Sequence, residues 1–120
     1  MGVGQQRGHL LKLFGVHVDQ AFGHIPYQVG SSLTEKRGWR DVDVRLMLPD
    51  DEYAAYFGDF PQRLVIWNLA WTALGCDMTG LPIDFQFQDH THTNEEYPGV
   101  RSALVLTTDD LPLVNVKGAT

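Results

Sequence analysis

The sequence predicts an α/β (α+β) domain in which a small mixed β-sheet is covered on one face by helices. Two segments, residues 40–48 and 81–88, alternate apolar and polar side chains with the period of two that is typical of a strand with one buried face. Between them, and in residues 10–22, apolar residues recur at helical spacing instead. Helices and strands interleaved in this way form a sheet with helices packed on it.

Composition limits the class of protein. The chain has 120 residues, of which 43% are apolar and 20% charged, as expected for one globular domain. We expect that domain to span residues 1–107 and residues 108–120 to form a tail. No apolar run approaches the roughly 18 residues of a membrane-spanning helix, and the N-terminus lacks a signal-peptide pattern, so we expect a cytoplasmic protein without a membrane partner. Cys76 is the only cysteine, which excludes an intrachain disulfide.

The first third of the chain predicts a helix, a strand and a turn. The helix covers residues 10–22 and ends at Gly23. Its apolar stripe consists of Leu11, Phe14, Val18 and Phe22. A short buried strand follows at residues 25–29. The next segment, residues 30–38, is polar and turn-rich, and its hydroxyl side chains can cap a short helix.

The middle of the chain predicts a strand followed by two helices. In residues 40–48 one face carries Val42, Val44, Leu46 and Leu48, and the other carries Asp41, Asp43, Arg45 and Met47. Pro49 ends this strand, and the acidic residues 50–52 begin a helix that reaches Phe57. Asp59 is expected to cap the next helix, which ends at Gly75. The apolar stripe of that helix consists of Leu64, Trp67, Trp71 and Leu74.

The last third predicts another strand, a loop and a short final strand. In residues 81–88 one face carries Ile83, Phe85 and Phe87, and the other carries Asp84, Gln86 and Gln88. Residues 89–99 predict a polar loop, and residues 103–107 a last short strand. The loop contains His90 and His92, which are too few ligands for a zinc site by themselves.

Three aspartates indicate a candidate metal site. Asp41 and Asp43 are two positions apart on a strand, so they share a face and repel each other unless a cation lies between them. Asp84 is a single acid in the apolar alternation of the other strand. If the two strands are neighbours, all three acids reach one site, where they can hold two divalent ions.

A glycine turn and a group of basic residues suggest a phosphate-bearing ligand. Gly30 and Ser31 follow the strand at residues 25–29, and glycine lets backbone N–H groups approach a phosphate closely. Four of the nine basic residues lie within ten positions: Lys36, Arg37, Arg40 and Arg45. The net charge of −6 argues against binding a long nucleic acid duplex. A small phosphate-bearing molecule held together with a metal is the better match.

These elements resemble those of the nucleotidyltransferase superfamily, which includes DNA polymerase beta, the aminoglycoside nucleotidyltransferases and the minimal nucleotidyltransferases. The matching segments are Val29-Gly30-Ser31, Asp41-Val42-Asp43-Val44 and Ile83-Asp84-Phe85, with nine residues between Ser31 and Asp41. The resemblance covers about residues 8–90. The chain also looks like small proteins of this fold found in bacteriophage genomes.

The resemblance implies a nucleotidyltransferase-like fold and a Mg²⁺-dependent enzyme that transfers a nucleoside monophosphate from a nucleoside triphosphate, such as ATP, to an acceptor hydroxyl with release of pyrophosphate. The nucleotide-binding residues would be Gly30, Ser31, Ser32, Lys36, Arg37 and Arg45. The catalytic and metal-ligating residues would be Asp41, Asp43 and Asp84. They would hold two Mg²⁺ ions, for which Mn²⁺ can substitute, and Asp84 would help to deprotonate the acceptor. That acceptor would be a small molecule, a nucleic acid end or a protein hydroxyl.

The chain departs from the family in two places. Many small relatives carry Arg-x-Arg-Gly directly after the Gly-Ser pair, whereas here Lys36 or Arg37 would have to supply the charge. Larger relatives have a C-terminal helical domain, and only about 30 residues follow the strand that carries Asp84. Either a second copy of the chain or a partner subunit completes the site, or the acceptor pocket is minimal, or the chain has lost activity.

Three alternatives stay open. The chain can be a catalytically inactive relative that binds a nucleotide or a protein, for example as one half of a two-component system. It can be a metal-dependent phosphodiesterase or nuclease that uses the same acids. Finally, Asp41 and Asp43 can lie on an ordinary solvated strand face, where Arg40 or Arg45 pairs with them and no metal binds.

Overall fold

The computed structural model describes residues 5–34, 38 and 40–107 of the chain. The predicted tail at residues 108–120 lies outside the described residues. The elements follow one another in the order α1 (Gln5–Phe22), β1 (Tyr27–Val29), α2 (Ser31–Thr34), β2 (Val42–Leu48), α3 (Asp50–Phe57), α4 (Pro61–Thr79), β3 (Ile83–Asp89), α5 (His90–Glu96) and β4 (Ser102–Ala103). This order agrees with the predicted α/β class.

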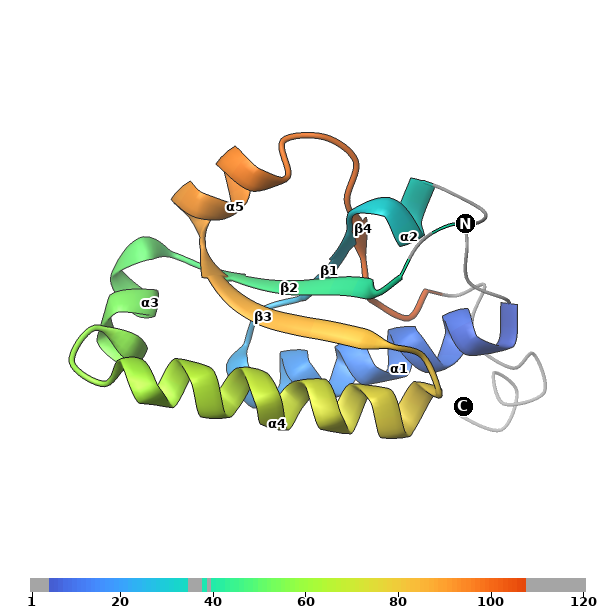
Figure 1. Ribbon diagram of the computed structural model, residues 1–120, viewed down its shortest axis with the longest axis horizontal. Helices are drawn as coiled ribbons and strands as arrows, with labels where there is room; N and C mark the ends of the chain where they lie inside the picture. The colour runs from blue at the N-terminus through green and yellow to red at the C-terminus, as the bar shows by residue number, and fades with distance from the viewer. Residues whose placement is uncertain (1–4, 35–37, 39, 108–120) are drawn as a thin grey trace, which may run out of the picture.

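The sheet is mixed, as the sequence predicts. Its strands lie in the order β3-β2-β1-β4. The β2–β3 pair is parallel, whereas β1 pairs antiparallel with both β2 and β4. The two long helices α1 and α4 cover one face of the sheet, and the short helices α2 and α5 lie on the other side (Figure 1). The two faces therefore have different roles: one carries the core, and the other remains partly open.

The core lies between the sheet and the two long helices. The four apolar residues predicted for one face of β2 are all fully buried, as is Phe85 of β3. Phe14 of α1 packs edge-on against Phe85, with ring centroids 5.9 Å apart. Phe22 at the end of α1 contacts both Phe87 and Trp67. Burying each such side chain contributes roughly 1.5–3 kcal/mol, so this aromatic layer fixes α1 and α4 onto the sheet.

Helix α4 differs from its prediction at both ends. Its N-cap residue is Phe60, with no side-chain capping hydrogen bond, so the predicted Asp59 cap is wrong. The predicted end at Gly75 is also wrong, because the helix continues to Thr79 and ends at the left-handed Gly80. Gly75 has a packing role instead: a Cβ there would lie 3.0 Å from Phe14 and 3.1 Å from Ile83.

Helix α5 replaces the loop predicted for residues 89–99. The carboxylate of Asp89 accepts the backbone N–H of His92 at 2.7 Å and so caps the helix start. At the other end the Arg101 guanidinium donates to the carbonyl oxygens of Thr93 and Tyr97. The helix was missed because Thr93 is its only buried residue, so its sequence has no apolar stripe.

The predicted last strand at residues 103–107 is reduced in the structure to the two residues of β4. Leu104, the next residue, is buried in the core, and its backbone N–H donates to Pro26. Among the described helices, none is both long enough and apolar enough to cross a membrane.

Alanine substitutions at two glycines of α1 are expected to change the stability of the protein in opposite directions. A Cβ at Gly15 would collide with the carbonyl oxygen and Cβ of Leu104, whereas nothing lies within 4 Å of a Cβ at Gly8. Gly15→Ala should therefore destabilise the fold by about 1–3 kcal/mol. Gly8→Ala should stabilise it by up to about 1 kcal/mol. Urea unfolding of both variants measures the difference, and an equal gain at both positions would contradict the close approach of α1 to Leu104.

Candidate functional site

The strand register brings two of the three predicted acids together. Asp43 of β2 lies directly opposite Asp84 of parallel β3 and opposite Val29 of antiparallel β1. Because neighbouring strands are about 4.8 Å apart and facing residues point the same way, the two carboxylates share the face opposite α1 and α4. Gly30 follows Val29, so the predicted glycine turn is at the same level of the sheet. The expectation that β2 and β3 are neighbours is confirmed.

Two features of the structure at position 30 require glycine. Its φ of +79° lies in the left-handed region, where side chains are strained. A Cβ built on it would also collide with the Asp43 carboxylate. The turn backbone therefore lies directly against the acid, as the predicted contact between Gly30 and a ligand at the acids requires.

The two serines after Gly30 have different surroundings. Ser31 is exposed at the start of α2. Ser32 is fully buried, and its hydroxyl accepts a hydrogen bond of 3.1 Å from the Gln28 amide. Ser32 thus holds α2 to β1, while Ser31 is open to a ligand. The predicted phosphate contacts Lys36 and Arg37 lie outside the described residues.

Arg45 lies beneath the two acids. Its side chain is only 3% exposed, and Nη2 lies 3.4 Å from Asp84 Oδ2 and 3.7 Å from Asp43 Oδ1. Nη1 donates to the backbone carbonyls of Asp84 and Val44. Nη2 also donates to the hydroxyl of Tyr97, whose ring centroid lies 5.6 Å from the guanidinium carbon. Arg45 Nε is buried without a hydrogen-bond partner.

Burial and neighbouring charges both act on Asp43. Burial, the largest cause, raises the pKa of the Asp43 carboxyl; the nearby Arg45 lowers it, whereas Asp84, Asp41 and Glu96 raise it further. The net shift of this pKa is upward. The side chains of Asp43 and Asp84 remain 21% and 38% exposed. An additional cation can therefore reach them from solvent.

Asp43 and Asp84 suit a magnesium ion as a pair. Mg²⁺ commonly takes one or two carboxylates and completes its shell with water and phosphate oxygens. The acids Asp84, Asp41 and Glu96 all raise the pKa of Asp43, so a cation bound there would lower their repulsion. Asp41 is exposed and precedes β2. Within the described residues, no group of three or more His, Cys, Asp and Glu side chains could hold a metal, so Asp41 stands apart from a three-acid cage.

A small cavity adjoins the acids. Its volume is about 260 Å³, and it is lined by Gly30, Thr34, Glu96 and residues 97–100. Its lining residues come from the turn at Gly30, from α2, and from the end of α5 and the segment that follows it; α2 and α5 lie on the same side of the sheet (Figure 1). Tyr97 and Glu96 are site residues that the sequence did not indicate, because residues 89–99 were predicted to be a loop without a defined position.

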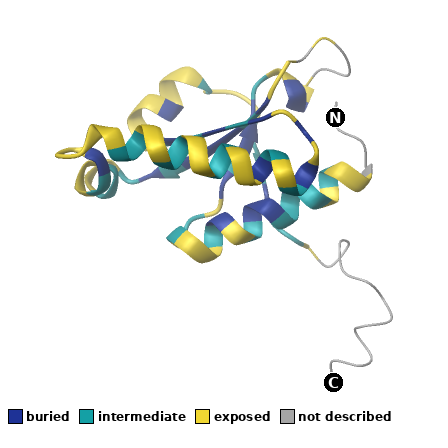
Figure 2. Ribbon diagram, turned by 60° about the horizontal axis from the view of Figure 1, so that its bottom comes forward, coloured by how far each residue is buried: buried dark blue, intermediate teal, exposed yellow. Residues whose placement is uncertain are grey.

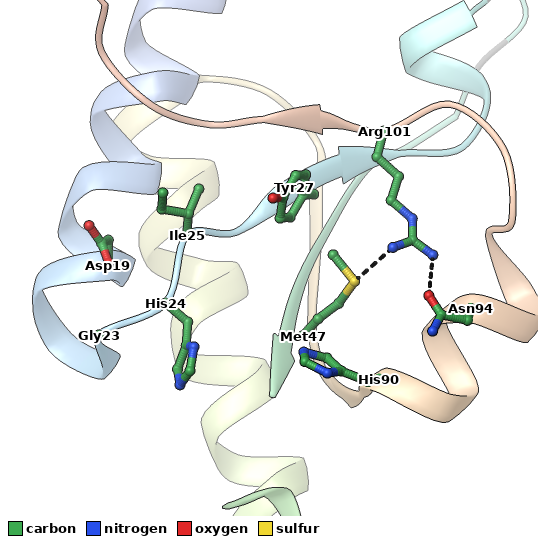
Figure 3. A pocket seen from close by; sticks show the side chains of 9 residues that line it. All are labelled: Asp19, Gly23, His24, Ile25, Tyr27, Met47, His90, Asn94 and Arg101. Carbon is green, nitrogen blue, oxygen red and sulfur yellow. Dashed lines mark hydrogen bonds between the residues drawn. The ribbon is translucent and has the colours of Figure 1, made fainter. Parts of the chain in front are cut away.

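A second cavity of about 730 Å³ lies at the other end of the sheet, near Tyr27 and Met47. Figure 3 shows Arg101 between Met47 and Asn94, with hydrogen bonds to both. The Arg101 guanidinium also donates to carbonyl oxygens at the end of α5, so it is already engaged in hydrogen bonds within the fold. His90 lines this cavity, whereas His92 is bound to the carboxylate of Asp89 at 2.8 Å. The two histidines therefore do not act together.

No model of a known protein family matches this chain, and no curated protein matches it.

Replacing Asp43 by asparagine should stabilise the metal-free protein at neutral pH. The pKa of Asp43 is raised in the folded state, so its ionised form opposes folding above that pKa. Below it the carboxyl is neutral, and the advantage of Asp43→Asn should disappear as the pH falls. Thermal unfolding of both proteins in EDTA from pH 3 to 8 tests this. A variant that is less stable at pH 7 would show that Asp43 is instead a net stabilising partner of Arg45.

Replacing Arg45 by methionine should have the opposite effect. The loss of this buried cation leaves two facing carboxylates unpaired and should cost about 3 kcal/mol in EDTA. Because Mg²⁺ can take over the neutralising role, it should restore part of that stability. Arg40→Met is the matched control, since Arg40 is exposed and its loss should stay within about 0.5 kcal/mol. Urea unfolding with and without Mg²⁺ measures both, and an Arg45→Met protein indifferent to Mg²⁺ would count against cation binding by the acids.

Proposed function

We propose that this protein is a Mg²⁺-dependent nucleotidyltransferase that transfers a nucleoside monophosphate from a nucleoside triphosphate to an acceptor hydroxyl. The observation that carries the proposal is the alignment of Asp43 with Asp84 across β2 and β3, directly beside the turn at Gly30. A carboxylate pair next to an open glycine turn combines a place for a divalent ion with a place for phosphates.

In this proposal Asp43 and Asp84 hold the metal, and Asp41 at the edge of the site assists. The ion supplies charge neutralisation of the phosphates and orients them. The backbone at Gly30 and Ser31 contacts the triphosphate. The acceptor oxygen forms a bond to the α-phosphorus as the bond to the pyrophosphate oxygen breaks, and Asp84 accepts the hydroxyl proton. Most of the catalysis is then positioning and charge stabilisation, as is general for phosphoryl transfer.

The cavity beside Gly30 gives the nucleotide a position. With its triphosphate at Gly30, the nucleoside extends toward Thr34 and residues 97–100, which line that cavity. Its volume of about 260 Å³ leaves much of a nucleotide exposed.

A second candidate function is favoured by Arg45. Its guanidinium already contacts both acids, so it takes part of the role of a metal ion. A chain in which Arg45 keeps this position would bind a nucleotide or a protein partner without turnover. This is the inactive relative that the sequence left open, and one assay separates the two functions.

The assay incubates the full chain with each nucleoside triphosphate, Mg²⁺ or Mn²⁺, and candidate acceptors. We expect pyrophosphate release, and a fall of at least about 10²-fold in Asp43→Asn and in Asp84→Asn. Asp59→Asn is the matched control, because Asp59 is an exposed aspartate between α3 and α4 and its replacement should leave the rate unchanged.

Other results of the same assay decide between the functions. Triphosphate binding without pyrophosphate release by any acceptor would favour the non-catalytic relative. Cleavage of nucleic acid in the absence of a triphosphate would point to a nuclease. Pyrophosphate release that persists in both asparagine variants would rule out the acids as the catalytic groups.

A further inference from the structure

The outward side of α4 is apolar over three turns. Every exposed residue between positions 65 and 74 is aliphatic, namely Val65, Ile66, Leu69, Ala70, Ala73 and Leu74. The first three are 59–65% exposed. Leu74, predicted to be part of the buried stripe, is 40% exposed and belongs to this outer side. These exposed residues run along the helix in Figure 2. A helix that faces water normally carries charged residues here, so a continuous apolar strip indicates a binding surface.

We propose that this strip pairs with the same strip of a second copy of the chain, the two α4 helices running antiparallel about a twofold axis between Leu69 and Ala70. In that register two of the three pairs combine a large residue with a small one. Ile66 faces Ala73 of the partner subunit, and Leu69 faces Ala70 of the partner subunit, whereas Val65 and Leu74 of the partner subunit form an aliphatic pair at the ends of the strip. A symmetric contact requires a patch that is complementary to itself, and these pairs are compatible with one.

Charge at the two ends of the strip favours the same arrangement. Arg63 lies near the start of α4 and Asp77 near its end, and the first turn contains no acid. Both placements oppose the dipole of their own helix, which prefers acids at the start and bases at the end. Antiparallel pairing brings Asp77 of the partner subunit to the helix start, next to Gln62 and close to Arg63. The second copy therefore supplies the negative charge that the first turn of α4 lacks.

The groove beside the strip favours a helix as the occupant. Val65, Asn68, Leu69 and Thr72 stand at the spacing of a coiled-coil hole, and with β3 they enclose about 280 Å³. Addition of a strand to β3 is blocked, because Thr72 Oγ1 accepts the N–H of Phe85 at 3.0 Å and Asn68 Oδ1 accepts that of Phe87 at 2.9 Å. Asp84 also lines this groove, so the contact borders the acid pair without depending on the proposed function.

Sedimentation of the full chain over a range of concentrations tests the proposal. We expect a dimer whose dissociation constant rises at least tenfold in Leu69→Glu, with an unchanged circular dichroism spectrum because Leu69 is exposed. Val100→Glu is the matched control, since Val100 is equally exposed but lies outside α4. A monomer at all concentrations, or a dimer insensitive to Leu69→Glu, would overturn the proposal. A different protein, or residues 108–120, would then be the partner of the strip.

Cross-linking tests the antiparallel register. In a Cys76→Ser background, Gln62→Cys and Asp77→Cys are prepared separately and treated with a short bismaleimide. We expect a cross-linked dimer when the two variants are mixed and none when either is alone, because equivalent positions are about 22 Å apart along antiparallel helices. Cross-linking of each variant with itself would show parallel helices and refute the proposed register.

Discussion

The site depends on the parallel pairing of β2 with β3. The chain leaves β2, crosses one face of the sheet as α3 and α4, and returns as β3 in the same direction. Because α4 and α1 bury the aliphatic face of both strands, the residues between those aliphatic positions must point to the other face. That constraint places Asp43 against Asp84. A shift of one residue in either strand would turn one acid into the core, so core packing and acid placement are fixed together.

The same constraint places Arg45 on the face of the sheet that carries the acids. It is two residues after Asp43 on the same face, and its side chain turns back under both acids to reach the carbonyl oxygen of Asp84. Two carboxylates on adjacent strands would otherwise destabilise the pairing that brings them together. The guanidinium lowers the pKa of Asp43, whereas burial and the neighbouring acids raise it. Arg45 therefore offsets part of the repulsion within the acid pair, which lets the fold tolerate it.

Much of the fold could be predicted from the sequence because its two longest strands, β2 and β3, have strict alternation. The same alternation predicted which face would carry Asp43, Asp84 and Arg45. Sequence spacing left open whether Arg45 pairs with the acids or binds a ligand, since that depends on cross-strand distances. Helix α5 could not be predicted, because it is held by polar contacts at its ends and not by an apolar stripe. The sequence predicts a helix end at Gly75 because the contact of Gly75 with Phe14 is long-range and leaves no local signal.

The two sides of the sheet are stabilised by different interactions, and this difference bears on the site. The side of α1 and α4 is held by aromatic and aliphatic packing. The side of α5 is held by single polar contacts, chiefly Asp89 at one end of the helix and Arg101 at the other. Elements with few buried apolar contacts open at lower free energy than the core. Since Arg45 contacts both Asp84 and Tyr97, a ligand that draws this guanidinium away from the acids also releases a contact with the segment after α5. Arg45 therefore links the acid pair to Tyr97, which lines the cavity beside Gly30.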